Sequence, residues 1–99
     1  MTEKLIKYLT KNNRRLKITT SNRKNKQRHV ISIDNKEPKI NVHYGDLAMK
    51  EYKGTKRGDN YCSRSLGIAK KYNILNDMTT ANYWSRLDLW NCVGSKSKK

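Results

Sequence analysis

The sequence predicts an α+β protein with a small antiparallel sheet of about three strands, an N-terminal helix, a C-terminal helical hairpin, a basic loop and a basic tail. Two patterns indicate this fold class. Apolar and polar side chains alternate in three stretches of the first half, as in half-buried strands, and aromatic residues recur at helical spacing near the end. A chain of 99 residues holds one domain at most, which we place at residues 1–94 with the tail at 95–99.

The first element is expected to be a helix over residues 2–11. The threonine at its start can act as the N-cap, and Leu5, Ile6 and Leu9 would then share one face. The two asparagines at 12–13 suit the end of this helix, because asparagine tolerates the left-handed conformation.

Three strands are expected next, at residues 15–19, 29–34 and 40–44, where apolar and polar residues alternate. Residues 34–38 would form the turn between the second and third strands, with a proline placed before a strand and not inside one. Between the first two strands lies SNRKNKQR, residues 21–28, which contains no apolar side chain. This segment therefore predicts an exposed basic loop.

The segment after the sheet is less regular. Residues 46–53 suit either a fourth strand or a helical turn, and GTKRGD at 54–59 predicts a glycine-bracketed basic loop. Asp59 or Asn60 can then cap a short helix, which Gly67 would end after two turns.

The second helix of the hairpin would be capped by a threonine at 79 or 80 and run to about residue 90. The pattern Tyr-x-Ser-Arg occurs at 61–64 and again at 83–86, so each helix would carry a tyrosine and an arginine on the same face. The rings are expected to pack as a core, while each arginine either contacts a phosphate or partner or has a structural role. The predicted core residues are Tyr61, Tyr83, Trp84, Leu87 and Trp90.

The net charge of +15 predicts a polyanionic partner, either nucleic acid or an acidic protein surface. The charge is uneven, because residues 1–33 carry ten Lys and Arg against one acid. Leu, Ile and Val number only 18 and Phe is absent, so the core is expected to be small and dependent on its aromatic residues. The candidate contacts are Arg14, Arg15, Arg23, Lys24, Lys26, Arg28, Lys56, Arg57, Arg64 and Arg86.

Residues 54–92 resemble a short pattern in small or terminal modules of viral proteins, from phages and large DNA viruses. In that pattern a Lys-Arg-Gly loop leads to Tyr-Cys-x-Arg-Ser-x-Gly-Ile, and a later Ser-Arg precedes a tryptophan and often a cysteine. The function of the pattern is undefined, so the resemblance implies a viral source and assigns no catalytic role. The matching positions are Lys56, Arg57, Gly58, Tyr61, Cys62, Arg64, Ser65, Gly67, Ile68, Ser85, Arg86, Trp90 and Cys92.

The location implied by these features is a virion or the host cytoplasm. No apolar run approaches the roughly 18 residues of a membrane span, and the N-terminal segment lacks the apolar region of a signal peptide. We therefore expect a protein that is neither secreted nor in a membrane. In a reducing compartment Cys62 and Cys92 would be free thiols and not a disulfide.

The residues that could carry chemistry do not form a recognised catalytic motif. His29 and His43 could complete a Cys₂His₂ zinc site, but the spacings match no compact zinc motif. Together with Asn41 they also allow a His-Asn-His nuclease interpretation, which lacks the acid and the helix that such a site needs. We expect these side chains to face solvent on strands, with no catalytic residue, no metal and no other cofactor.

The sequence thus favours a non-enzymatic viral structural or accessory protein, docked among other virion proteins and able to contact packaged DNA or RNA through phosphates. No membrane and no small-molecule substrate is expected as a partner. The alternative is a free, sequence-tolerant nucleic-acid-binding protein or host-takeover regulator. A His-Asn-His-like nuclease is a third and least favoured hypothesis.

Overall fold

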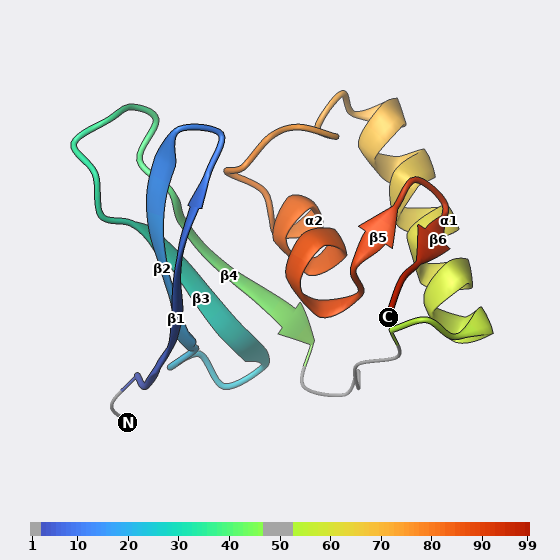
Figure 1. Cartoon of the computed structure of the whole chain (residues 1–99), viewed down its shortest axis with the longest axis horizontal. Coiled ribbons are helices and arrows are strands. Elements are labelled where there is room, and N and C mark those ends of the chain that lie inside the picture. The colour runs from blue at the N-terminus through green and yellow to red at the C-terminus, as the bar shows by residue number, and fades with distance from the viewer. Residues whose placement is uncertain (1–2, 47–52) are drawn as a thin grey trace. The chain divides into compact units, whose positions relative to one another are not determined.

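The structure is a computed structural model that describes residues 3–46 and 53–99, and its α+β class is as predicted (Figure 1). Where the sequence suggested one domain over residues 1–94, the chain divides into two compact units, Met1–Leu47 and Ala48–Lys99. The N-terminal unit contains the sheet, and the C-terminal unit contains the helices with a small two-stranded sheet.

The sheet of the N-terminal unit has four antiparallel strands in the order in which they occur along the chain. The strands are β1 (Leu5–Lys11), β2 (Arg14–Thr20), β3 (Lys26–Ser32) and β4 (Asn41–Asp46). Ile18, Val30 and Val42 lie directly opposite one another on three neighbouring strands, and all three are buried. They form the centre of the apolar face of this sheet.

The N-terminal helix expected over residues 2–11 is wrong, because Leu5–Lys11 form strand β1. Asn12 and Asn13 are left-handed, as expected, with φ values of 51° and 64°. Two such residues favour a tight hairpin, whose twist matches that of the flanking strands. The register shifts between Leu5 and Lys7, so a bulge interrupts the alternation of β1 and leaves an apolar spacing that imitates a helix.

The other predicted strands are confirmed with shifted ends. β3 begins at Lys26, so the basic loop is shorter than the expected 21–28, and both Lys26 and Arg28 are strand residues. His29 is buried, contrary to the expectation of a solvent-facing position. The alternative between a fourth strand and a helical turn for 46–53 concerns mostly residues 47–52, which lie outside the described part of the chain.

The first helix of the C-terminal unit, α1 (Lys56–Lys71), is longer than predicted at both ends. Thr55 is its N-cap, since its hydroxyl accepts a hydrogen bond from the Gly58 N–H at 3.0 Å. The expected loop at 54–59 is therefore largely helix, and Gly67 does not end it. A Cβ at Gly67 would meet nothing within 4 Å, so this glycine is an exposed position inside the helix.

The second helix is confirmed in position and in its cap. Thr80 accepts a hydrogen bond from the Tyr83 N–H, and α2 (Ala81–Trp84) continues into the π-helical turn η1 (Ser85–Leu89). Trp84 and Trp90 are buried, as predicted for the aromatic core. No helix in the ranges 3–46 and 53–99 is long and apolar enough to cross a membrane.

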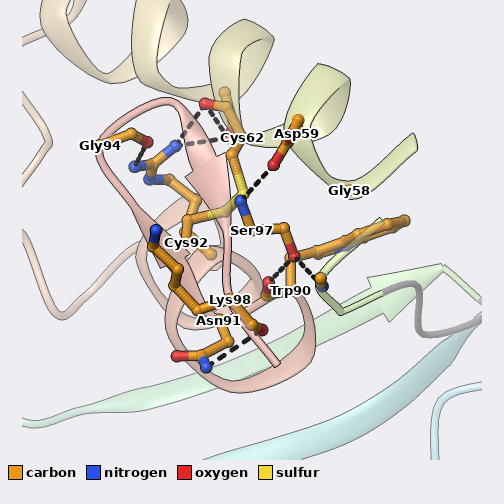
Figure 2. The surroundings of a disulfide bond; sticks show 12 residues. Gly58, Asp59, Cys62, Trp90, Asn91, Cys92, Gly94, Ser97 and Lys98 are labelled. Carbon is orange, nitrogen blue, oxygen red and sulfur yellow. Dashed lines mark hydrogen bonds between the residues drawn. A yellow bond between two sulfur atoms is a disulfide. The ribbon is translucent and has the colours of Figure 1, made fainter. Parts of the chain in front are cut away.

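Residues 95–99 are not simply a tail, because Lys96–Ser97 form strand β6 and pair with β5 (Cys92–Val93). Ser97 is buried: its N–H donates to Asp59 Oδ1 at 2.8 Å and its hydroxyl to the Trp90 carbonyl (Figure 2). The bond to Asp59 attaches β6 to the start of α1.

The expectation of free thiols is also wrong, since Cys62 and Cys92 form a disulfide that joins α1 to β5 (Figure 2). Their Cα atoms lie 5.5 Å apart, within the range that a disulfide spans. The contact arises because β5 returns alongside α1, a long-range feature that the 30-residue separation conceals. The disulfide also excludes the Cys₂His₂ zinc site, because the two sulfurs are bonded to each other and are not available as thiolate ligands.

Candidate nucleic-acid interface

The exposed side of α1 is strongly basic. Arg57, Arg64 and Lys71 follow one another at intervals of seven residues. Lys56, Ser63 and Lys70 form a second series with the same interval. At about 3.6 residues per turn, residues spaced by seven lie on nearly the same side of a helix. We define the basic face of α1 by eight exposed residues: Lys56, Arg57, Asn60, Ser63, Arg64, Gly67, Lys70 and Lys71.

The opposite side of α1 fixes which residues face outward. Gly58, Cys62, Ser65 and Ala69 are all buried and all small, which allows close packing on this side. The disulfide at Cys62 and the hydrogen bonds that Arg86 donates to the Cys62 carbonyl and the Ser65 hydroxyl further limit rotation of the helix. The basic face is therefore held outward by the core of the C-terminal unit.

The basic face carries five cations and no acid. The single carboxylate within α1, that of Asp59, turns instead toward the C-terminal segment, where it accepts from the Ser97 N–H and lies 3.8 Å from Lys96 Nζ. Lys70 and Lys71 lie in the last turn, where positive charge is favoured by the helix dipole. Because α1 has 16 residues, the face extends for about 24 Å.

Three of the predicted contact residues, Lys56, Arg57 and Arg64, lie on the basic face. Arg86 does not. It is buried, and its guanidinium donates to the Cys62 carbonyl at 2.7 Å, the Ser65 hydroxyl at 2.8 Å and the Gly94 carbonyl at 2.7 Å. Of the two roles left open for Arg86, the structure supports the structural one.

The remaining predicted contacts belong to the N-terminal unit. Arg14 forms a two-point ion pair with Asp34, at 3.0 Å and 3.1 Å, and also donates to the carbonyls of Lys36 and Pro38. This arginine therefore anchors the 34–38 turn. Arg15, Arg23 and Lys24 are exposed, while Lys26 and Arg28 are half-buried on β3.

The predicted aromatic core is assembled within the C-terminal unit. Tyr61 stacks on Trp90 with ring centroids 4.4 Å apart, and Tyr83 meets Trp84 edge-on at 5.1 Å. Burial raises the pKa of Tyr61. The Trp84 indole N–H donates to the Met78 carbonyl at 2.7 Å, and Leu87 is half-buried. The first Tyr-x-Ser-Arg unit thus gives one core ring and one surface cation.

Sequence reasoning missed five members of the basic face: Asn60, Ser63, Gly67, Lys70 and Lys71. It ended the helix at Gly67, so the last turn and its lysines were not placed on the same side as Arg57. The seven-residue spacing of Arg57, Arg64 and Lys71 was the signal that could have identified the face.

A comparison of the chain with protein-family models, curated proteins and solved structures found no match. The resemblance of residues 54–92 to viral modules therefore stays a prediction.

Proposed function

We propose that this chain is a non-enzymatic nucleic-acid-binding protein that contacts duplex DNA through the basic face of α1. The observation that supports this function is the face itself, with five cations on one side of a single helix and no carboxylate among them. Phosphate contacts of this kind supply most of the affinity of sequence-tolerant binding.

The dimensions of α1 fit this role. A helix with its side chains is about 10–12 Å wide, and the major groove of B-DNA, about 12 Å wide, admits one. In such a complex the arginines and lysines at the edges of the face reach phosphates on both strands. Asn60 and Gly67 lie in the middle of the face, where a short amide side chain and a missing Cβ allow close approach to the bases. The deep, narrow major groove of duplex RNA does not admit the helix.

The proposal also includes where the protein acts. The viral resemblance covers α1 and the residues that hold it, so we place the protein with viral DNA, either as a structural or accessory protein in a particle or as a free regulator in the host cell. An acidic protein neighbour is the competing partner, because it would also match a basic helix face.

The proposal is tested by a salt titration of DNA binding with the triple variant Arg57→Gln, Arg64→Gln, Lys71→Gln. Each lost phosphate contact flattens the slope of log K against log salt by about 0.9, so the triple variant should flatten it by about 2–3. The loss should be similar on two unrelated duplexes, because phosphate contacts position a protein without reading bases.

A matched control is the triple variant Lys4→Gln, Lys7→Gln, Lys39→Gln, which removes the same charge from exposed positions of the N-terminal unit. It should keep most of the parent slope. An equal effect of the two triple variants would mean that net charge, and not the face, drives binding. If duplex DNA does not bind at all near physiological salt, the proposal fails and an acidic protein partner takes its place.

A further inference from the structure

A cluster of polar side chains lies on the sheet face opposite Ile18, Val30 and Val42. His29 of β3 and His43 of β4 are directly paired in the strand register, and their rings stack with centroids 3.8 Å apart. Glu3, just before β1, reaches the same place, with its Oε2 2.7 Å from His29 Nδ1. Each of these three residues offers one ligand atom, and the three atoms all lie within 4.8 Å of one another.

Neighbouring side chains orient both imidazoles. His29 Nε2 lies 2.5 Å from the Asn41 side-chain oxygen, an acceptor, so this nitrogen carries the proton that it donates. His43 Nδ1 lies 2.7 Å from the Ser21 hydroxyl, whose oxygen also accepts from the Arg23 N–H. With Nε2–H donating to Asn41, His29 Nδ1 is the atom left to face Glu3. Metal-binding histidines are commonly held in this way by a second hydrogen bond.

We propose that Glu3, His29 and His43 form a binding site for a divalent transition-metal ion of the zinc class. Two imidazoles and one carboxylate are a donor set typical of zinc, cobalt or nickel, whereas magnesium and calcium require mainly oxygen ligands. A fourth position remains for water. The ion ties the segment before β1 to β3 and β4, which makes it a structural ion for the N-terminal unit.

Binding has a defined structural cost. The planes of the two rings lie 15° apart, so their in-plane lone pairs do not converge on one point. An ion about 2.1 Å from each nitrogen therefore requires His43 to turn away from the stacked arrangement. Because histidine and glutamate bind metal ions in their deprotonated forms, metal binding should weaken as the pH falls.

The test uses the full chain, without nucleic acid, titrated with Co²⁺ and then with Zn²⁺ near neutral pH. The parent should bind one Co²⁺ per chain with visible absorption bands, and Zn²⁺ should abolish them. Mg²⁺ should have no effect. Glu3→Gln and His43→Gln should each weaken Co²⁺ binding by about 10-fold or more, a loss at least as large as that from altering an outer-shell partner.

Glu37→Gln is the matched control, because it removes the same charge from an exposed position of the same unit and should bind Co²⁺ as the parent does. Circular dichroism shows whether each variant is folded. If a variant unfolds, the imidazole ¹⁵N shifts of the parent decide the question, since Zn²⁺ should move the resonances of both histidines. No binding, or binding that Glu3→Gln and His43→Gln leave unchanged in folded protein, overturns the proposal.

Discussion

Arg64 and Arg86 occupy the same position in two copies of one short pattern, yet they have different surroundings. Arg64 is exposed on the basic face of α1, whereas Arg86 is buried and donates to oxygens of Cys62, Ser65 and Gly94. Burial lowers the pKa of Arg86, but a guanidinium remains charged under any ordinary condition. Three hydrogen bonds from one side chain therefore join α1, η1 and the turn between β5 and β6.

We expect Arg86→Leu to destabilise the protein by roughly 3 kcal/mol, because the buried Cys62 carbonyl and Ser65 hydroxyl lose a charged donor that water does not freely replace. Arg64→Leu is the matched control and should change the free energy of unfolding by less than about 0.5 kcal/mol. Urea unfolding of the two variants measures both values. Similar losses for the two arginines would contradict the structural role of Arg86.

Asp34 gives the protein a defined acid sensitivity. The Arg14 guanidinium and the backbone N–H groups of Arg15 and Lys36 all donate to this carboxylate, which holds its pKa well below the usual 3.8. Because the folded-state pKa is lowered, the stabilisation is fully present above about pH 4 and is lost as the pH falls toward the folded-state value.

Asp34→Asn should therefore lower stability at about pH 6, and its stability should fall less than that of the parent between about pH 5 and about pH 2.5. Urea unfolding at these pH values tests the difference. Glu37→Gln makes the same charge change in the same turn and should keep most of the parent's pH dependence. If the parent and Asp34→Asn lose the same stability as the pH falls over this range, the ion pair does not have this role.

At the level of elements, local patterns predicted those structures whose ends are set by nearby residues. Strands β2 and β4 follow their alternation, and the helix after Thr80 begins at its cap. β1 was mistaken for a helix, because a bulge disturbed its period and because pairing with β2 is not a local property. Only part of the basic face was predicted, because Gly67 was expected to end the helix. In the sequence, a glycine inside a packed helix looks the same as a glycine that ends one.

The Cys62–Cys92 disulfide is the element-level contact that sequence alone could not supply. It closes a loop with a sequence separation of 30, which by the chain-entropy estimate stabilises the folded state by about 3–4 kcal/mol. Cys62→Ser/Cys92→Ser should lose about this amount in thermal or urea unfolding. Reductant should lower the melting temperature of the parent and leave that of the double variant unchanged. A parent that is insensitive to reductant would show that the bond contributes little.

For the whole molecule, the dominant quantity is the net charge of +15 on 99 residues. Repulsion among like charges destabilises the folded chain, and added salt weakens that repulsion. The same salt weakens attraction to phosphates. Stability and DNA affinity are therefore expected to respond to ionic strength in opposite directions.

We expect the melting temperature to rise by several degrees between about 10 mM and about 150 mM NaCl, as the Debye length falls from about 30 Å to about 8 Å. Differential scanning fluorimetry in a dilute buffer measures the change. The triple variant Lys4→Gln, Lys7→Gln, Lys39→Gln carries less charge and should gain less from the same salt. A melting temperature that falls with salt would mean that attractive ion pairs outweigh the repulsion.

The hydrogen bond between Gly54 and Ser97 has a consequence for protein engineering. The Gly54 N–H donates to the Ser97 hydroxyl at 3.1 Å, so the chain enters and leaves this part of the C-terminal unit at neighbouring points. A segment whose ends meet can be grafted into a surface loop of an unrelated host, because the host loop has almost no gap to span. Residues 53–99 are therefore a candidate cassette, in which the disulfide and the β5–β6 pairing would carry the basic helix into a new scaffold as one piece.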